Sequence, residues 1–267
     1  KEFCTNYEDD ALFRAYGSHA VMNDDQLRNV TSVDGWFDIH TDVMDLTSLE
    51  KTTIDTLKAA TMKPLEELQK ITLPATLKVI EEKAFATNIQ LQWADFSQCA
   101  EADVLTESNI GNLGINEHTL IYAPESFTAT GHTNVVYGTE GNLKCDRFTI
   151  SDDAAYAVPR AFTARAISYD RPFVLGEATT LCLPFDMELP VGANAYLLDK
   201  EMKNTLVVER VNRIEAYKPY VIITTKNMTF STQMETAVPV ASNSISQVTS
   251  ANYVMTGTFK ALTAGEV

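Results

Sequence analysis

Side chains that could do chemistry are scattered along this 267-residue chain and form no catalytic pattern. The four histidines, at positions 19, 40, 118 and 132, show no His-x-x-x-His spacing and no acid at a fixed offset. Glu81-Glu82 and Asp152-Asp153 are adjacent acids, whereas a glycosidase holds two carboxylates across a cleft. Adjacent side chains point in different directions, so such pairs mostly cover surface turns. We therefore predict that the protein is not an enzyme and has no catalytic residues, metal or cofactor.

The four cysteines indicate structural thiols rather than a metal or redox site. They include no Cys-x-x-Cys pair and no spacing typical of zinc ligands. One of them lies between two leucines and is expected to be a small buried residue. We expect four reduced thiols, and leave open whether any of them pair in a disulfide: Cys4, Cys99, Cys145 and Cys182.

The charge of the chain limits the partners that it can bind. Lys and Arg number 21 against 36 Asp and Glu, which gives a net charge of −15, and no basic run occurs. Nucleic-acid binding requires a cationic surface, and anionic membranes attract basic segments, so we expect neither partner. No apolar stretch approaches the roughly 20 residues that span a bilayer. The chain begins with Lys1, so we expect any signal or lipid-anchor segment before it to have been removed or never to have been cloned.

The stretch from Leu68 to Cys99 indicates which elements position these side chains. Its apolar residues combine the alternation of a short strand with a wider spacing, as one turn of a solenoid does. Ile71-x-Leu73 returns 23 residues later as Ala94-x-Phe96, which is within the range of repeat proteins. We predict a short, irregular solenoid of parallel strands with a helix from Thr53 to Ala60 and with Phe85 in its interior. Further strands are expected near Met44, Leu120 and Asn134.

Residues 68–85, LQKITLPATLKVIEEKAF, resemble the BspA-type leucine-rich repeats of surface proteins from gut anaerobic bacteria. The resemblance implies an α+β fold, in which a short leucine-rich-repeat solenoid forms a right-handed β-α superhelix. It also implies an exported protein on the outer cell surface or outside the cell, after removal of an export or lipoprotein signal. Such relatives are interaction or adhesion proteins.

From about Gly138 the sequence changes character. The helical spacing ends, and alternating segments such as Phe162–Ala166 are separated by turn residues. These segments predict an antiparallel β-sandwich-like domain, with Cys182, Leu183 and Phe185 in its core. We therefore expect two domains, a cap with leucine-rich repeats over residues 1–139 and an all-β domain over 140–267. The phrases TLCLPFD and RIEAYKPY resemble the β-domain of the same surface proteins; that domain continues further in them, so we expect a truncation at Val267.

Alternation along the predicted strands indicates one candidate binding face. If Ala94 and Phe96 point into the solenoid, Trp93 points outward beside polar groups, as at many interaction hot spots. Packing of Trp93 against residues 100–117 or against the β-domain is the alternative. The predicted ligand-binding face comprises Trp93, Asp95, Lys70, Thr72, Asp45 and Thr47, with Ile121 beside them.

These observations together predict a non-catalytic cell-surface or secreted interaction protein of the adhesion type. Its partner would be a protein or a glycan at the cell exterior. A polysaccharide-binding accessory protein or a glycan-active enzyme is the alternative, and a structural spacer is a third possibility. The sequence leaves the ligand and the oligomeric state open.

Overall fold

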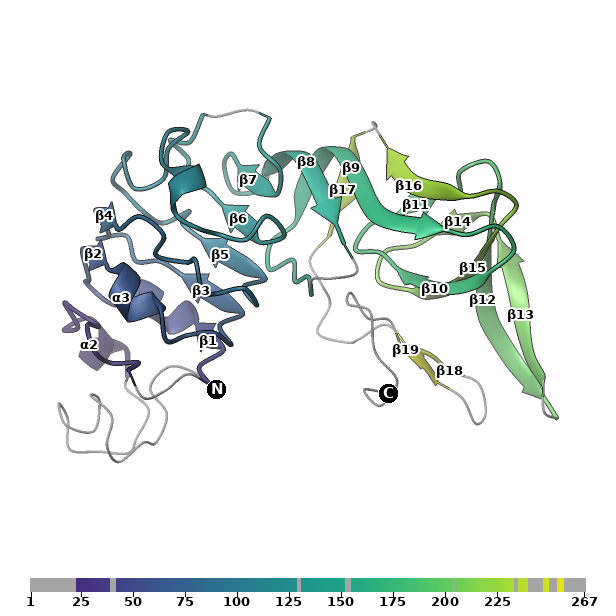
Figure 1. Cartoon of the computed structure of the whole chain (residues 1–267), viewed down its shortest axis with the longest axis horizontal. Helices are drawn as coiled ribbons and strands as arrows, with labels where there is room; N and C mark the ends of the chain where they lie inside the picture. Colours follow the sequence, from purple (N-terminus) through teal and green to yellow (C-terminus); the bar gives the residue numbers. More distant parts are fainter. Residues whose placement is uncertain are drawn as a thin grey trace. The chain divides into compact units, whose positions relative to one another are not determined.

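The chain divides into two compact units of the computed structural model, Lys1–Glu140 (unit 1) and Gly141–Val267 (unit 2) (Figure 1). The division between the two units lies one residue after the domain boundary that the sequence predicts. The structure describes residues 23–38, 42–128, 131–151, 155–203, 205–232, 235–239, 247–249 and 254–256. Cys4, two of the histidines (positions 19 and 40) and the end of the chain at Val267 lie outside the described residues.

Short strands of unit 1 stack in parallel into a ladder, as the sequence predicts. The strand at Ile71 pairs in parallel with the strand at Ala94, and Ala94 in turn pairs with Ile121. A second ladder joins β2 (Thr56–Leu57) to β4 (Val79–Ile80), also in parallel. The first ladder runs in the order β1 (Asp45–Leu46), β3 (Lys70–Thr72), β5 (Trp93–Asp95), β6 (Leu120–Tyr122) and β7 (Val135–Tyr137).

The predicted β-α superhelix is wrong, because unit 1 is a β-solenoid of stacked coils. The described α-helices are α2 (Asp24–Leu27) and α3 (Ala59–Met62), each four residues long. Two 3-10 helices, η1 (Thr47–Lys51) and η2 (Ile110–Asn112), add single turns. The helix expected from Thr53 to Ala60 is replaced by β2 and the start of α3. The α+β leucine-rich-repeat class is therefore corrected to a nearly all-β one.

Single turns elsewhere in unit 1 show that an apolar spacing of three residues does not require a helix. The N–H of Leu68 donates to the carbonyl of Leu65, and the N–H of Cys99 donates to the carbonyl of Phe96. Both ends of each of these turns are buried. An i to i+3 turn at each corner of a coil therefore points two apolar side chains inward. A helix is not needed to satisfy the same sequence pattern.

Polar side chains bind each coil to the backbone of the coil before it. The hydroxyl of Thr76 donates to the carbonyl of Ile54 at 2.7 Å, and the hydroxyl of Thr119 donates to the carbonyl of Leu91 at 2.8 Å. These bonds satisfy carbonyls at the corners, where the ladders do not reach. They recur at about one coil length, so they hold the stack in register.

The interior of unit 1 is a continuous apolar column built by all the coils. Phe85 is buried there, as predicted, and its ring meets that of Phe96 edge to face at a centroid separation of 6.4 Å. Such a ring pair adds stabilisation beyond the buried area of the two side chains. One coil cannot bury its own apolar row, so stability depends on stacking.

The described elements of unit 2 are strands, and their pairing is both parallel and antiparallel, whereas the sequence predicted a purely antiparallel domain. β8 (Lys144–Ile150) and β9 (Phe162–Phe173) are parallel, while β9 pairs antiparallel with β16 (Met228–Thr232) and β17 (Thr236–Val238). A second, antiparallel sheet has the order β10, β15, β12, β13. Its strands are β10 (Ala178–Cys182), β15 (Pro219–Thr224), β12 (Ala193–Met202) and β13 (Thr205–Val211). Short pairs join β11 (Met187–Glu188) to β14 (Arg213–Ile214) and β18 (Gln247–Thr249) to β19 (Val254–Thr256).

Aromatic side chains form the core of unit 2. Phe173 stacks on Phe230 with ring centroids 4.4 Å apart. Leu183 and Phe185 are buried, which confirms their predicted place in this core. Cys182 is only half-buried, so the prediction of a fully buried thiol is wrong. Strand alternation is the reason, because Leu181 takes the buried position in β10 and its neighbour must take the other face.

Candidate functional site

The ladder places most of the predicted face residues in adjacent rows. Asp45, Lys70 and Trp93 lie side by side in one row, and Thr72 pairs with Asp95 in another. Ile121 was expected on the same face, but it lies opposite Ala94 in the apolar interior. The expectation for Ile121 is therefore wrong by one residue, because β6 brings Leu120 opposite Trp93.

Burial removes much of this face from solvent. Trp93 is 8% exposed, and Thr72 is buried as well. Leu120 and Tyr122, which follow in the same two rows, are also buried. The expectation of an exposed aromatic platform is therefore wrong. The run Leu120-Ile121-Tyr122 already indicated this burial in the sequence, because three consecutive apolar residues are typical of a strand that is buried on both faces.

The accessible part of the predicted face is an ion pair between two coils. The Lys70 ammonium lies 2.8 Å from an Asp45 carboxylate oxygen, and the lysine is the more exposed partner. The other Asp45 oxygen accepts the Thr47 N–H at 2.9 Å and its hydroxyl at 2.7 Å. Burial alone would raise the pKa of Asp45, but the bonds from Lys70 and Thr47 outweigh it and lower the pKa. These three residues thus close the turn after β1.

Asp95 and Cys99 also have structural roles. The Asp95 carboxylate accepts the Ser97 N–H at 2.8 Å, which fixes the turn after β5. Burial, helped by the negative charge of Asp95, raises the pKa of the Cys99 thiol to about 12. A thiol with such a pKa stays protonated at neutral pH and is a poor nucleophile or metal ligand.

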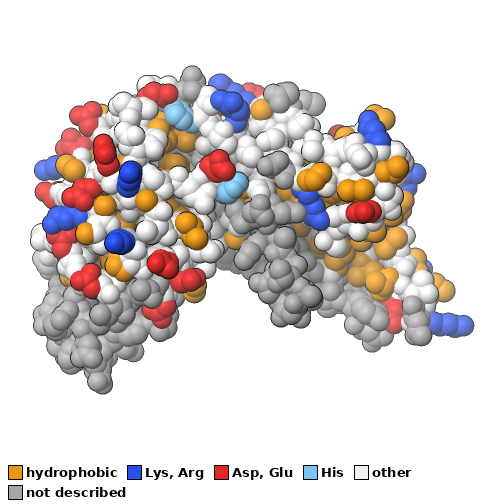
Figure 2. Space-filling view, in the orientation of Figure 1, with side chains coloured by type: hydrophobic (Ala, Val, Ile, Leu, Met, Phe, Trp, Pro, Cys, Tyr) orange, Lys and Arg blue, Asp and Glu red, His pale blue; other side chains and the backbone are white. Residues whose placement is uncertain are grey.

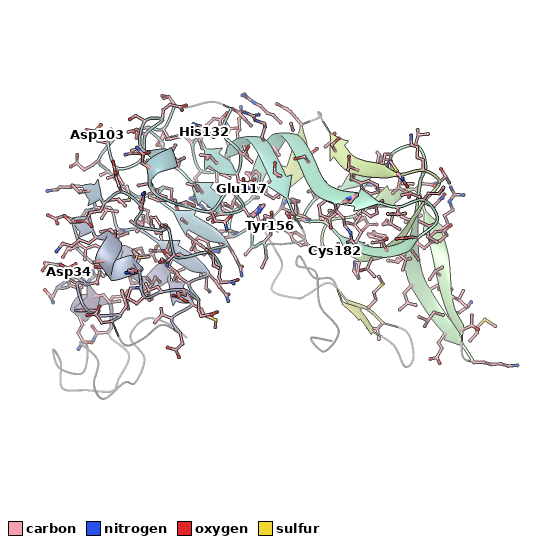
Figure 3. The ribbon with its side chains drawn as sticks, viewed as in Figure 1. Asp34, Asp103, Glu117, His132, Tyr156 and Cys182 are labelled. Carbon is pink, nitrogen blue, oxygen red and sulfur yellow. The ribbon has the colours of Figure 1, made fainter. Side chains whose placement is uncertain are left out.

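A concave region near the end of the ladder is a second candidate, which the sequence did not predict. One hollow of about 480 Å³ lies between residues 102–107 and 126–128. Another, of about 250 Å³, lies between residues 107–121 and 132–135. Both are lined by Glu107. Figure 3 shows His132 and Glu117 beside β6 and β7, on loops that follow or precede these strands.

A histidine–glutamate pair lies where the two hollows meet. The His132 Nε2 is 2.8 Å from a carboxylate oxygen of Glu107, and the glutamate is 65% exposed. The His132 ring also meets the ring of Phe127 at a centroid distance of 6.0 Å. Nothing in the sequence revealed the pair, because its members are 25 residues apart and no spacing rule connects them. We call these two hollows and this pair the Glu107 concavity.

The loop that carries Glu107 is firmly packed, although the sequence suggests a loose polar insertion over residues 100–117. Leu105, Ile110 and Leu113 from this loop are buried in the core of unit 1. The carbonyl of Leu113 accepts the N–H of Phe85 at 3.0 Å. Gly114 follows at φ +73, where a Cβ would come within 3.0 Å of the Ala86 backbone. The loop therefore holds the concavity on a rigid base.

A groove of about 560 Å³ lies in unit 2, between the β11–β14 pair and the β16–β17 edge. Arg213 forms an ion pair with Asp186, whose other oxygen accepts the N–H of Ala216 at 2.8 Å. The hydroxyl of Tyr217 donates to the carbonyl of Pro239 at 2.6 Å. Asp186, Arg213 and the Pro239 carbonyl, which line the groove, are therefore already paired within unit 2.

Within the described part of the chain, no three His, Cys, Asp or Glu side chains gather as a metal site requires. No helix in the described segments has the length and apolar character needed to cross a bilayer.

No protein-family model, no curated protein and no solved structure matches the chain.

Proposed function

We propose that this chain is a non-catalytic interaction protein of the adhesion type, which binds a protein or glycan partner through the Glu107 concavity. The observation that carries the proposal is the 2.8 Å contact between His132 and Glu107 in an open hollow on a packed loop. Insertions in repeat proteins commonly supply the binding face, because the stacked coils hold them rigidly. Action at the cell exterior rests on the resemblance of residues 68–85 to exported surface proteins.

The chemistry of the concavity fits a partner with both apolar and hydrogen-bonding groups. Phe127 and Ile110 line it with apolar surface, while the exposed carboxylate of Glu107 accepts hydrogen bonds. His132 holds that carboxylate in place, so its orientation is fixed before a partner arrives. Preorganisation of this kind reduces the entropy that binding must overcome.

Glycan processing is a second candidate, and the same pair is the observation that favours it. A carboxylate next to an imidazole can take up and release a proton during hydrolysis. The hydrolysis of a glycosidic bond usually needs two carboxyl groups on opposite sides of the bond. Glu117 lines one of the two hollows and would be the second carboxylate in that case.

The proposal is tested with the full chain on a glycan array and on a panel of extracellular host proteins. For any partner found, Glu107→Gln should weaken binding about tenfold or more, because a charged hydrogen bond contributes roughly 1.5–3 kcal/mol. The matched control is Glu82→Gln, an exposed glutamate on another coil. Equal affinities for wild type and Glu107→Gln would contradict the proposed site.

Product analysis separates the two candidate functions. A bound glycan should be recovered intact after long incubation with the protein if the function is binding alone. Release of shorter fragments, abolished in Glu107→Gln and in Glu117→Gln, would instead establish the enzymatic alternative.

A further inference from the structure

An open strand edge in unit 2 lies outside the proposed binding site. β13 is the last strand of its sheet and pairs with β12 on one side only among the described strands. Proteins usually protect such an edge with a proline, a bulge or an inward-pointing charge. β13 reads Thr-Leu-Val-Val-Glu-Arg-Val, which has no proline, and the register shift of the hairpin lies in β12. β13 itself therefore has neither a proline nor a bulge, and its two charged residues, Glu209 and Arg210, lie toward one end of the strand.

The opposite edge of the same sheet provides a contrast. There the guanidinium of Arg171 donates to the carbonyl of Thr180 in β10 at 3.0 Å. That bond occupies an edge carbonyl with a charged side chain, which discourages pairing with another strand. No comparable contact to β13 occurs in the described part of the structure, so among the described residues only the β10 edge has such a bond.

Apolar side chains accompany the free edge. Leu206 is 50% exposed and Val208 is 42% exposed. They are two residues apart and so lie on the same face of the strand. Figure 2 shows hydrophobic side chains gathered over the end of unit 2 where the β12–β13 hairpin projects. Exposed apolar residues on an unprotected edge favour pairing with another strand.

We propose that β13 pairs antiparallel with β13 of a second copy of the chain, so that two sheets join into one. A two-fold axis at Val207 brings Leu206 of each copy opposite Val208 of the other. Directly opposite side chains share a face, so this register covers the two exposed apolar residues on each copy. The interface is isologous, as in most homodimers.

Two further observations favour this occupant and this register. β13 contains one glutamate and one arginine, so the edge is neutral in a chain whose net charge is −15. Two copies would thus meet where their mutual repulsion is small. An axis at Glu209 would instead place the two glutamates opposite each other, which is unfavourable. An axis at Val208 would place Leu206 opposite Arg210 and leave its apolar surface poorly covered.

The dimer should be weak and concentration-dependent. A pairing of one strand from each copy is smaller than the roughly 1,200–2,000 Å² that a stable interface buries. We expect a dissociation constant on the order of 10 to 1,000 µM. This association does not involve the Glu107 concavity, so it is independent of the proposed function.

Sedimentation velocity of the full chain from about 5 to about 300 µM, at physiological salt, tests the proposal. The weight-average mass of the wild type should rise from 29.5 kDa toward twice that value. Leu206→Glu and Val208→Lys should each remain monomeric. An equimolar mixture of the two variants should associate again, because the introduced charges of opposite sign then face each other across the axis.

Control variants separate this edge from general stickiness. Val191→Lys changes a residue that is 89% exposed outside β13, and it should dimerise like the wild type. Val208→Ile keeps the edge apolar and should also dimerise. If circular dichroism shows that Leu206→Glu does not fold, the comparison of Val208→Lys with Val208→Ile tests the proposal instead. A wild type that stays monomeric at every concentration, or a mixture that does not associate, would overturn the proposal.

Discussion

Asn88 is a buried amide that joins two coils of the solenoid, and replacing it tests how the stack is held together. Its side chain is 1% exposed, and its Nδ2 donates to the carbonyls of Leu65 at 2.7 Å and Met62 at 3.1 Å. Both carbonyls belong to the preceding coil. Each also accepts one backbone N–H, so neither loses every partner when the amide is removed.

The size of the effect follows from these bonds. Each hydrogen bond contributes about 0.5–1.5 kcal/mol, so Asn88→Ala should lower the free energy of unfolding by about 1–3 kcal/mol. The lower half of that range is expected, because the Asn88 Oδ1 has no partner among the described residues and its removal relieves a cost. Asn88→Asp places a buried carboxylate next to two carbonyls, and we expect a loss of about 3–5 kcal/mol at neutral pH.

The pH dependence distinguishes the two variants. Burial without a positive partner should raise the pKa of the introduced carboxyl above about 3.9, its value in the unfolded chain. The penalty is then absent below that pH and grows as pH rises toward the folded-state pKa, by about 1.4 kcal/mol per unit. Asn88→Ala contains no titrating group at this position, so its difference from the wild type should stay constant with pH.

Urea unfolding followed by tryptophan fluorescence measures these differences, because both tryptophans, Trp36 and Trp93, lie in unit 1. Each variant is compared with the wild type at several values between about pH 4 and pH 8. Asn112→Asp, at an exposed position on the same unit, is the control and should cost less than about 0.5 kcal/mol. An Asn88→Asp protein as stable as the wild type at neutral pH would refute the argument that this amide joins the coils.

Three further predictions concern other parts of the two units. Phe85→Ala should destabilise unit 1 by about 3–5 kcal/mol in urea unfolding, because Phe85 is buried; a near-zero change would show that the ring lies outside the core. Asp45→Asn should cost about 1 kcal/mol at neutral pH through the lost pair with Lys70. The pKa of Asp45 is lower in the folded protein than in the unfolded chain. The stabilisation by the ion pair is therefore complete when the pH is above the unfolded-state pKa, and it disappears as the pH falls through the folded-state pKa. A stability difference between wild type and Asp45→Asn that grew in acid would contradict this prediction. Partial burial raises the pKa of Cys182 to about 12, so Cys182 in native protein should react with iodoacetamide at pH 8 on the order of tens of times more slowly than an ordinary thiol, because the smaller thiolate fraction outweighs the higher nucleophilicity of that thiolate. Labelling at the rate of an unfolded control would show that the thiol is open to solvent.

Several features of the fold were readable in the sequence because short-range patterns set them. The 23-residue return of Ile71-x-Leu73 as Ala94-x-Phe96 predicted the parallel pairing that β3 and β5 show. Alternation identified Ala94 and Phe96 as interior residues, and both are buried. In the second half, alternation located β9, and a short apolar run bounded by turn residues located the buried Leu183 and Phe185. Each of these inferences depends only on which neighbouring side chains are apolar.

The helix prediction failed because an apolar spacing of three fits two structures equally well. Ile54 and Leu57 can both face a core from one side of a helix, but in the structure they are buried while Leu57 belongs to β2 and pairs with Ile80 of the next coil. The choice depends on hydrogen bonds to other coils, such as those from Asn88 and Thr76 to the preceding coil. A local pattern contains no information about those bonds.

The candidate site shows the same division between local pattern and tertiary structure. The sequence by itself determined the strand positions, and with them the row that joins Asp45, Lys70 and Trp93. Only the tertiary structure decided that Trp93 is buried and that Glu107 meets His132 across 25 residues of chain. Alternation specifies the face of a strand on which a side chain lies, whereas exposure and pairing depend on what the rest of the folded chain brings to that face.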